Sequence, residues 1–315
     1  MKLKIVFMGT PNFAVPILEA LIKEYNVVLV VSQPDKEYSR KKELLPTKTK
    51  MVAIKHNIDV FQPVKIKDEY QKILEYEPDM IITCAYGQII PKELLDYPKY
   101  GAINVHGSLL PKLRGGAPIH RALINGDDET GVTIMYMSYK MDAGDIISQR
   151  KISIEDTDNV DTLFTKLSYL GRDLLMETIP LIINNKNLRI KQNEEEVTYG
   201  LNIKKEEEII DFNDTKINIF NKIRGLSSIP GAYTYLNGKI LKIYSASILD
   251  NEYKGKNGQI VDVTRDGLVV KVKDGSLLIT DIKIEGKGRV LVKDYLNGIK
   301  DKTSLLNIVL GDKNE

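Results

Sequence analysis

The sequence predicts an α/β fold in which a Rossmann-like, largely parallel sheet with crossover helices is followed by a small β-barrel. The first part is predicted because strand and helix patterns alternate over residues 1 to about 185, and because the strand at 27–31 is wholly apolar, as a strand buried on both faces typically is. The barrel is predicted because several short strand patterns, separated by turn residues, fill residues 232–284. We therefore expect domains at 1–185 and 205–315, joined by a linker at 186–204.

The elements of the first domain follow from the spacing of its apolar residues. Residues 4–8 predict the first strand, which turns at residues 9–11 into a helix. Further strands are predicted at 27–31, 80–85, 101–106 and 130–137, and a helix that starts near Pro118 separates the last two. Leucines at helical spacing predict the helix that closes the domain: Leu163, Leu167, Leu170, Leu174 and Leu175.

The linker and the second domain differ from this in composition. The linker is polar, and we expect it to have little fixed structure, with the acidic residues 194–196 solvated. A short helix follows, marked by Ile217, Phe220 and Ile223 and ended by Gly225. Asn237-Gly238 then predicts a hairpin, the first of the barrel's short strands.

Composition restricts the possible functions. The chain has 315 residues, 43% hydrophobic and 28% charged, which is ordinary for a soluble globular protein. Its net charge of +2 means that a polyanion would have to be met by a local patch. The single cysteine, Cys84, excludes an intramolecular disulfide and suits a reducing compartment. With so few cysteines and histidines we expect no metal site, and without a signal or membrane-spanning pattern we expect a cytoplasmic protein.

Three polar residues near strand ends form the candidate active site. Asn104 and His106 point to one face of the strand at 101–106, because side chains alternate along a strand. Asp142 lies in a turn after the strand at 130–137, so we expect the three to hang from two strand ends of one sheet. Asn and protonated His can both donate to an oxygen that gains negative charge, and Asp can hold the imidazole and accept a proton. Spacing alone also allows three unrelated polar residues, each satisfied by backbone.

Two further observations concern the kind of protein that the sequence can encode. The first glycine turn, GTPNFA at residues 9–14, has one glycine and a proline where a dinucleotide-binding turn needs G-x-G-x-x-G, so a nicotinamide dehydrogenase is disfavoured. There is no P-loop and no G-x-S-x-G elbow. The segment 33–50 is long and basic for a strand-to-helix connection, which fits a functional loop and a solvated surface loop equally well.

Together these motifs resemble the folate-dependent formyltransferases. The resemblance rests on NVHGSLLP at 104–111, RGGAP at 114–118 and DAG at 142–144, and it extends over nearly the whole chain through shorter matches such as QPD at 33–35 and AYG at 85–87. It implies 10-formyltetrahydrofolate as the formyl donor and the methionine amino group of initiator methionyl-tRNA as the acceptor. It also implies that the second domain is an OB-like barrel that holds the tRNA.

The resemblance also assigns residues. It implies that Asn104 and His106 stabilise the tetrahedral oxyanion and that Asp142 orients His106 and assists proton transfer. The residues it implies for the folate site are Gly87, Ile89, Ile90, Ser108, Leu109, Leu110 and Pro111. It places Arg40 in a basic loop that enters the acceptor end of the tRNA, flanked by Lys41 and Lys42. The chain departs from the family in having Ser39 and Lys41 where glycines are usual beside this arginine, and in lacking tryptophan.

Two alternatives remain at the level of sequence. One is a formyltransferase of the same superfamily that acts on a small amine, such as a sugar nucleotide or glycinamide ribonucleotide. The other is an RNA- or nucleotide-binding module whose polar triad is inert. The basic segment and the β-rich second domain favour the tRNA substrate, and we expect the protein to be a monomer.

Overall fold

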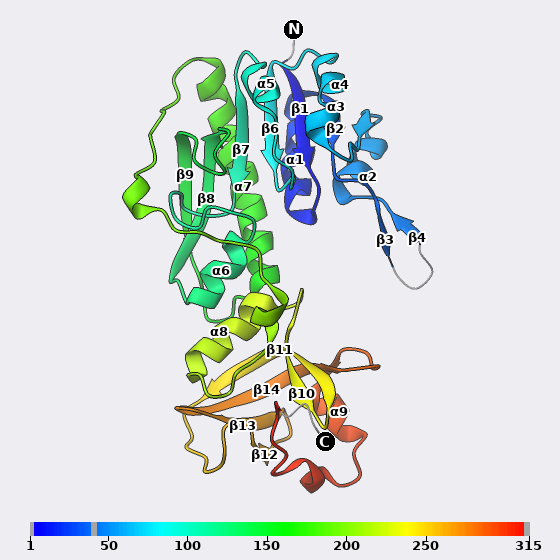
Figure 1. The fold of residues 1–315 in the computed structure, drawn as a ribbon, viewed down its shortest axis with the longest axis vertical. Coiled ribbons are helices and arrows are strands. Elements are labelled where there is room, and N and C mark those ends of the chain that lie inside the picture. Colours follow the sequence, from blue (N-terminus) through cyan, green and yellow to red (C-terminus); the bar gives the residue numbers. More distant parts are fainter. Residues whose placement is uncertain (1–2, 39–42, 312–315) are drawn as a thin grey trace. The chain divides into compact units, whose positions relative to one another are not determined.

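The chain divides into two units, neither of which is contiguous in sequence (Figure 1). The computed structural model describes residues 3–38 and 43–311. The first unit consists of the chain up to Pro118, Glu129–Ser153 and Phe164–Leu201. The second unit consists of Ile119–Asp128, Ile154–Leu163 and the chain from Asn202 on. The expected domain boundaries at residues 185 and 205 concern which parts of the chain fold independently, and they stay a prediction.

The first unit contains a seven-stranded sheet in the order β5-β2-β1-β6-β7-β8-β9. Five strands are parallel, and β8 and β9 at one edge are antiparallel, which confirms the largely parallel sheet. Because the parallel strands run the same way, β1, β2, β6 and β7 end at one edge, where a ligand site is expected in such sheets. The strands are β1 (Lys4–Gly9), β2 (Asn26–Val31), β5 (Val60–Phe61), β6 (Met80–Cys84), β7 (Ala102–His106), β8 (Glu129–Tyr136) and β9 (Ile146–Ser153).

Helices cover both faces of this sheet. On one face, Gly171 of α7 lies close enough to Val105 and Val132 that an added Cβ would meet them, so no larger residue fits between helix and sheet. On the other face, Ile73 of α4 and Leu94 of α5 pack into a cluster with Ile81 of β6. The helices are α1 (Val15–Glu24), α2 (Lys48–Lys55), α3 (Ile66–Glu69), α4 (Gln71–Leu74), α5 (Lys92–Asp96) and α7 (Val160–Ile183), with a 3-10 turn η1 (Asn12–Ala14). Within the described ranges, no helix is both long and apolar enough to cross a bilayer.

The basic segment at residues 33–50, which follows β2, contains a β-hairpin, whereas the sequence predicts only a loop there. β3 (Lys36–Tyr38) pairs antiparallel with β4 (Glu43–Leu45). Asp35, just before β3, is tied to the chain after β4, since its carboxylate accepts from the backbone N–H of Thr47 at 3.3 Å and also pairs with Lys50 of α2. Burial raises the pKa of Asp35, but hydrogen bonds from Gln62, Lys50 and Thr47 outweigh it and hold this pKa below its ordinary value. The expected tRNA-contacting residues Arg40, Lys41 and Lys42 lie outside the described residues.

The expectation of a linker with little fixed structure is wrong for residues 190–200, which we call the strap. Backbone hydrogen bonds join the strap to two parts of the first unit: Ile190 pairs with Ile146, and Arg114 pairs with Thr198 and Gly200. A 3-10 turn, η2 (Glu194–Glu196), lies in its middle. A polar sequence can be held in place by hydrogen bonds to its neighbours without an apolar face, and composition gives no sign of it.

The second unit is built on an antiparallel sheet in the order β10-β11-β14-β13-β12, with β15 paired to β14. The predicted hairpin is confirmed, because Asn237 and Gly238 both have positive φ, as a type I′ turn requires. Closure of this sheet into a barrel stays a prediction. The elements are α6 (Pro118–Asn125), η3 (Lys205–Glu208), α8 (Lys216–Leu226), β10 (Ala232–Leu236), β11 (Lys239–Leu249), β12 (Ile260–Val263), β13 (Leu268–Val272), β14 (Gly275–Ile284), β15 (Val290–Leu291), α9 (Val292–Asn297) and η4 (Lys302–Leu305).

One prediction about the second unit needs correction. Gly225 does not end the helix α8, which continues to Leu226. An added Cβ at Gly225 would come within 2.7 Å of the Ile124 side chain, and the carbonyl of Gly225 accepts a hydrogen bond from Nδ1 of His120 at 2.8 Å. The glycine is therefore explained by close packing against α6.

Candidate active site

The last strand of the parallel set, β7, positions Asn104 and His106. Ile103 and Val105 are buried on the face that α7 covers, so the alternation of a strand turns Asn104 and His106 to the opposite face. His106 is at the carboxyl end of β7 and only 6% of it is exposed, whereas Asn104 is half-buried. The sequence prediction that both point the same way is consistent with this register.

Asp142 reaches His106 from the turn that follows β8. β8 runs antiparallel to β7, with Tyr136 opposite Ile103, so its carboxyl end lies at the far end of β7 from His106. The connection to β9 must therefore return along the sheet before it presents Asp142. It does so: Oδ2 of Asp142 is 3.7 Å from Nδ1 of His106. As expected, the two residues follow two strands of one sheet, and the turn after β8 brings them together.

The backbone of this returning turn is tightly constrained. Asp142 has a φ of 50°, in the left-handed region that Asp tolerates better than most residues. Gly144 has no room for a side chain, because a Cβ there would overlap the backbone carbonyl of Tyr136. The path of the turn is therefore restricted at both residues, and this path brings the carboxylate back toward His106.

A single short stretch, Leu113–Gly115, holds both members of the pair. The carbonyl of Leu113 accepts from Nε2 of His106 at 3.1 Å, and the backbone N–H of Gly115 donates to Oδ2 of Asp142 at 2.8 Å. Because a carbonyl can only accept, the Nε2 nitrogen must carry a proton. The 3.7 Å between Nδ1 and Asp142 is too long for a direct hydrogen bond, so Nδ1 is the ring nitrogen open to a ligand oxygen.

Asn104 is oriented by a neighbour on β6. The hydroxyl of Thr83, which is buried, donates to Oδ1 of Asn104 at 2.8 Å. Since the amide oxygen is thereby occupied, the NH₂ group of Asn104 is the part that is left to donate to a ligand. In chemical terms, the arrangement offers one hydrogen-bond donor, Nδ2 of Asn104, and next to it Nδ1 of His106 beside a carboxylate; Nδ1 donates when both ring nitrogens carry a proton.

The loop after β7 is held by buried polar groups rather than by regular structure. The Thr133 hydroxyl donates to the carbonyl of Ser108 at 2.7 Å and accepts from the N–H of Leu110 at 3.1 Å. Ser108 is 1% exposed, and its hydroxyl donates to the carbonyl of Lys112 at 2.7 Å. This hydroxyl therefore shapes the turn. Leu110 is also buried, and Leu109 and Pro111 are half-buried.

The other expected ligand residues lie after β6. Gly87 has a φ of 89°, Ile89 is 78% exposed, and Ile90 is buried in the cluster with α5. A polar network that the sequence does not predict joins this stretch to the residues that follow β2: Nε2 of Gln33 donates to the carbonyl of Tyr86 at 2.9 Å, and Nε2 of Gln88 donates to Oε1 of Gln33 at 3.3 Å. The exposed side chain of Ile89 is thus available to a ligand, whereas that of Ile90 is committed to the core.

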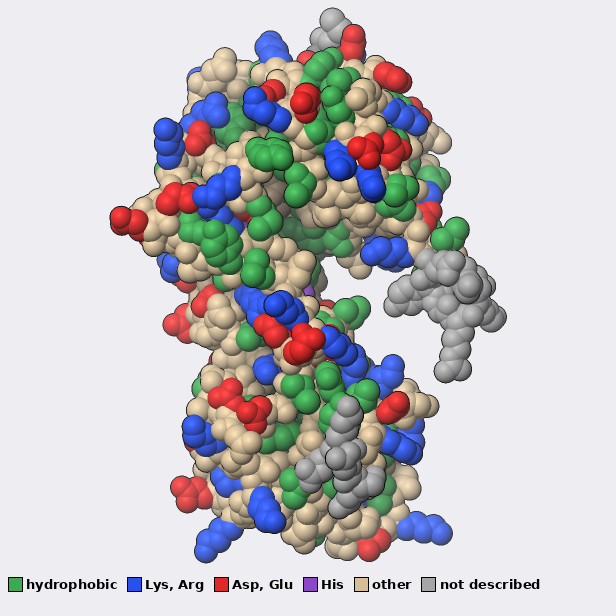
Figure 2. Space-filling model, in the orientation of Figure 1, with side chains coloured by type: hydrophobic (Ala, Val, Ile, Leu, Met, Phe, Trp, Pro, Cys, Tyr) green, Lys and Arg blue, Asp and Glu red, His purple; other side chains and the backbone are tan. Residues whose placement is uncertain are grey.

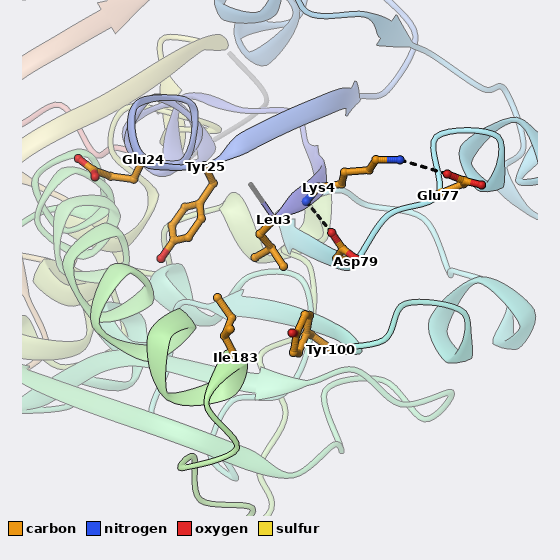
Figure 3. A pocket seen from close by; sticks show the side chains of 8 residues that line it. All are labelled: Leu3, Lys4, Glu24, Tyr25, Glu77, Asp79, Tyr100 and Ile183. Carbon is orange, nitrogen blue, oxygen red and sulfur yellow. Dashed lines mark hydrogen bonds and ion pairs between the residues drawn. The ribbon is translucent and has the colours of Figure 1, made fainter. Parts of the chain in front are cut away.

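A cavity of about 740 Å³ lies elsewhere in the first unit (Figure 3). It is lined at the amino ends of β1 and β6, by Lys4 and Asp79, so it is at the sheet edge opposite to His106. Three of its charged residues already have partners: Lys4 Nζ pairs with Glu77 at 3.1 Å, and the carboxylate of Asp79 accepts from the backbone N–H of Lys4 at 2.8 Å. These groups are already satisfied, so the cavity is not the candidate active site.

Sequence reasoning missed the residues that support the site. Thr83 and Leu113 act through a hydroxyl and a carbonyl, which no motif marks as functional. Gln192 lies in the strap, and its side-chain NH₂ donates to the carbonyls of Asp142 and Gly144, both at 2.8 Å. No signal in the sequence could have found Gln192, because it is a single glutamine in a polar stretch, about 50 residues from the groups that it contacts.

Two family models match the chain. A model described as "Formyl transferase" matches residues 1–179, and one described as "Formyl transferase, C-terminal domain" matches residues 202–300. The first match includes Asn104, His106 and Asp142, and the second includes most of the antiparallel sheet.

Individual proteins agree with the family models. The chain is 50% identical over 310 residues to a methionyl-tRNA formyltransferase of Staphylococcus epidermidis, covering 98% of this chain and 99% of that protein. It is also 50% identical over 302 residues to a methionyl-tRNA formyltransferase of Bacillus mycoides, covering 95% of this chain and 96% of that protein.

Solved structures at lower identity share the fold. The crystal structure of HypX from Aquifex aeolicus in complex with tetrahydrofolic acid has a TM-score of 0.66 at 18% identity, covering 95% of this chain and 47% of that chain. The sugar 3N-formyltransferase WlaRD has a TM-score of 0.65 at 21% identity, covering 91% of this chain and 100% of that chain. The family models and the full-length relatives establish that the chain belongs to the formyltransferase family, in the group of the methionyl-tRNA formyltransferases.

Proposed function

We propose that the protein transfers a formyl group from 10-formyltetrahydrofolate to the α-amino group of methionine on initiator methionyl-tRNA. The observation that supports this most directly is the pairing of His106 and Asp142 by the backbone of Leu113–Gly115, in a chain that is 50% identical over nearly its full length to methionyl-tRNA formyltransferases. The pair leaves Nδ1 open to a substrate oxygen, to which it donates when the imidazole is protonated on both nitrogens, beside a second donor on the same strand.

In this reaction the methionine amine attacks the formyl carbon, and the carbonyl oxygen gains negative charge. Nδ1 of His106 and Nδ2 of Asn104 donate to this oxygen, and one such donor is typically worth ~3–4 kcal/mol of barrier. Asp142 stabilises the charge on the imidazole and takes up the proton that the attacking amine releases. When the tetrahedral intermediate collapses, the carbon–N10 bond breaks and N10 of the folate leaves with a proton.

The folate would bind against the loop after β7 and the turn after β6. Leu109 and Pro111 are half-exposed apolar residues of the first, and Ile89 offers an exposed apolar side chain in the second. Gly87 leaves backbone groups accessible because it has no side chain. Ser108, Leu110 and Ile90 are buried, so we assign to them the shaping of the pocket rather than direct polar contact.

For the tRNA we propose contact through the basic segment that the β3–β4 hairpin carries, with Arg40, Lys41 and Lys42 as the contacting residues. A local contact is required, because the net charge is only +2 and Lys and Arg are interspersed with Asp and Glu on the face seen in Figure 2. Lys and Arg that neutralise phosphates make binding salt-dependent. Arg40→Ala should therefore weaken the use of tRNA and flatten its salt dependence, with the KM for the folate unchanged.

The test is formyl transfer from 10-formyltetrahydrofolate to charged initiator tRNA, compared with a sugar-nucleotide amine and glycinamide ribonucleotide as acceptors. Turnover with the tRNA and little with the small amines is expected. Turnover with a small amine alone would replace this proposal with the alternative acceptor. No turnover with any acceptor would refute formyl transfer by this chain. Light scattering on the same preparation tests the expected monomer.

A further inference from the structure

Gln192 of the strap lies between two parts of the site that are far apart in sequence. Its Oε1 accepts from Nε of Arg114 at 3.0 Å, and both hydrogens of its Nε2 are used, on the carbonyls of Asp142 and Gly144, at 2.8 Å each. A single side chain thus joins the loop after β7 to the turn that carries the carboxylate. None of these bonds involves a reacting group.

Arg114 connects the strap to the catalytic pair through its own backbone. It lies between Leu113, whose carbonyl holds Nε2 of His106, and Gly115, whose N–H holds Asp142. Its side chain is fully buried, and its hydrogen-bond partners are Gln192 and Glu194, both in the strap. Any shift of the strap therefore acts on both neighbours of Arg114 at once.

The turn of Asp142 needs such support. Asp142 is in the left-handed region, where a residue with a side chain is held only by its surroundings. Two of its groups are held: Oδ2 by the N–H of Gly115 and the carbonyl by Gln192. If the second bond is lost, the turn can relax, and the 3.7 Å separation from His106 is no longer fixed.

We propose that Gln192 is a positioning residue for the formyl transfer proposed above, which sets the place of Asp142 relative to His106 by holding the backbone of its turn. It touches neither substrate in this role. A displacement of about 1 Å at a reacting group can cost ~100-fold in rate, so removal of the two donors should lower kcat between ~10- and ~100-fold. The KM values should not change, because no binding group is moved.

The variant to test is Gln192→Glu. A glutamate keeps the length of the side chain and still accepts from Arg114, so the buried guanidinium does not lose a partner. It has no donor for the carbonyls of Asp142 and Gly144. The matched control is Asn193→Asp, an amide-to-carboxylate change at the adjacent, exposed residue, whose Oδ1 can still cap the N–H of Glu195. The control should keep the wild-type kcat.

A double-mutant cycle separates positioning from a merely structural role. If Gln192 acts through the carboxylate of Asp142, Gln192→Glu should lower kcat by less than ~3-fold in the Asp142→Asn background, because the group that it positions is already absent. A structural role would give the same factor in both backgrounds, and that result would overturn the proposal. Wild-type kcat in Gln192→Glu would also overturn it.

Two additions keep the outcome decisive. If Gln192→Glu does not fold, as judged by circular dichroism, the cycle is run with Gln192→Met, which adds no charge and removes the two donors together with the acceptor for Arg114. The acceptor that the wild-type enzyme uses is established first. If that acceptor is a small amine, the proposed tRNA substrate is wrong, whereas the cycle on Gln192 still decides this inference with the acceptor found.

Discussion

Asp142→Asn is the substitution that separates the charge of the carboxylate from its place in the fold. An asparagine has the same shape and can still accept from the N–H of Gly115, so the turn should be kept. What is lost is the negative charge 3.7 Å from Nδ1 of His106. The imidazole then has to carry positive charge in the transition state without a nearby anion.

The size of the loss follows from Coulomb's law and from the burial of the pair. At this distance, two unit charges attract by about 1 kcal/mol in water and by about 4 kcal/mol at an effective dielectric constant of ~20. The side chains of His106 and Asp142 are only 7% and 14% exposed, which favours the upper half of this range. We expect kcat to fall by ~100-fold or more, since each 1.4 kcal/mol is about one factor of ten.

The assay measures kcat for formyl transfer at saturating concentrations of both substrates, together with the thermal midpoint of each protein. The matched control is Asp145→Asn, the same change three residues along the turn, at a carboxylate that pairs with the exposed Arg189. It should leave kcat within ~2-fold of the wild type. A loss of less than ~5-fold in Asp142→Asn, or an equal loss in the control, would refute the electrostatic reasoning.

Three further outcomes are expected. Thr83→Val removes the hydroxyl that orients Asn104 at constant volume, so kcat should fall ~5–10-fold while both KM values stay unchanged. Gly144→Ala adds a Cβ that overlaps a backbone carbonyl of β8, so the thermal midpoint should fall by more than ~5 °C in a circular-dichroism melt. A hydrogen bond from Arg121 is the main reason that the pKa of Glu207 is lowered from 4.5 to about 2, so the ionised carboxylate stabilises the fold. This stabilisation is complete above pH 4.5 and is lost as the pH falls toward 2. The urea midpoints of the wild type and Glu207→Gln should therefore converge as the pH falls through this range.

Most of the fold could be predicted because its signals are local. The wholly apolar run of β2, the Asn237-Gly238 turn and the leucine spacing of α7 each report a burial pattern or a backbone angle within a few residues. The hairpin β3–β4 was missed because its composition is that of a solvated basic segment, and nothing in the sequence indicates that Asp35 is tied to the chain after β4.

The candidate site was predictable only in part, for a physical reason. Alternation along one strand places Asn104 beside His106, so their common direction is a local property. The approach of Asp142 depends on a turn that returns along an antiparallel strand, so the strand ends alone do not fix how close the carboxylate comes to the imidazole. The strap was misread because hydrogen bonds, unlike apolar faces, leave no periodic pattern in a sequence.

Arg114 shows how the two kinds of information combine. Its place in the family motif does not say what it does, and a fully buried guanidinium is a costly way to fill space, since a charge must be taken out of water. An apolar residue of similar volume would pack with less cost, but it could not bind Gln192 and Glu194 of the strap. Stability is therefore a poor explanation for this residue. Positioning is a better explanation, because Arg114 lies between the two backbone groups that hold His106 and Asp142 and fixes both of them. A reaction that depends on the distance between His106 and Asp142 needs both groups to be fixed from one point.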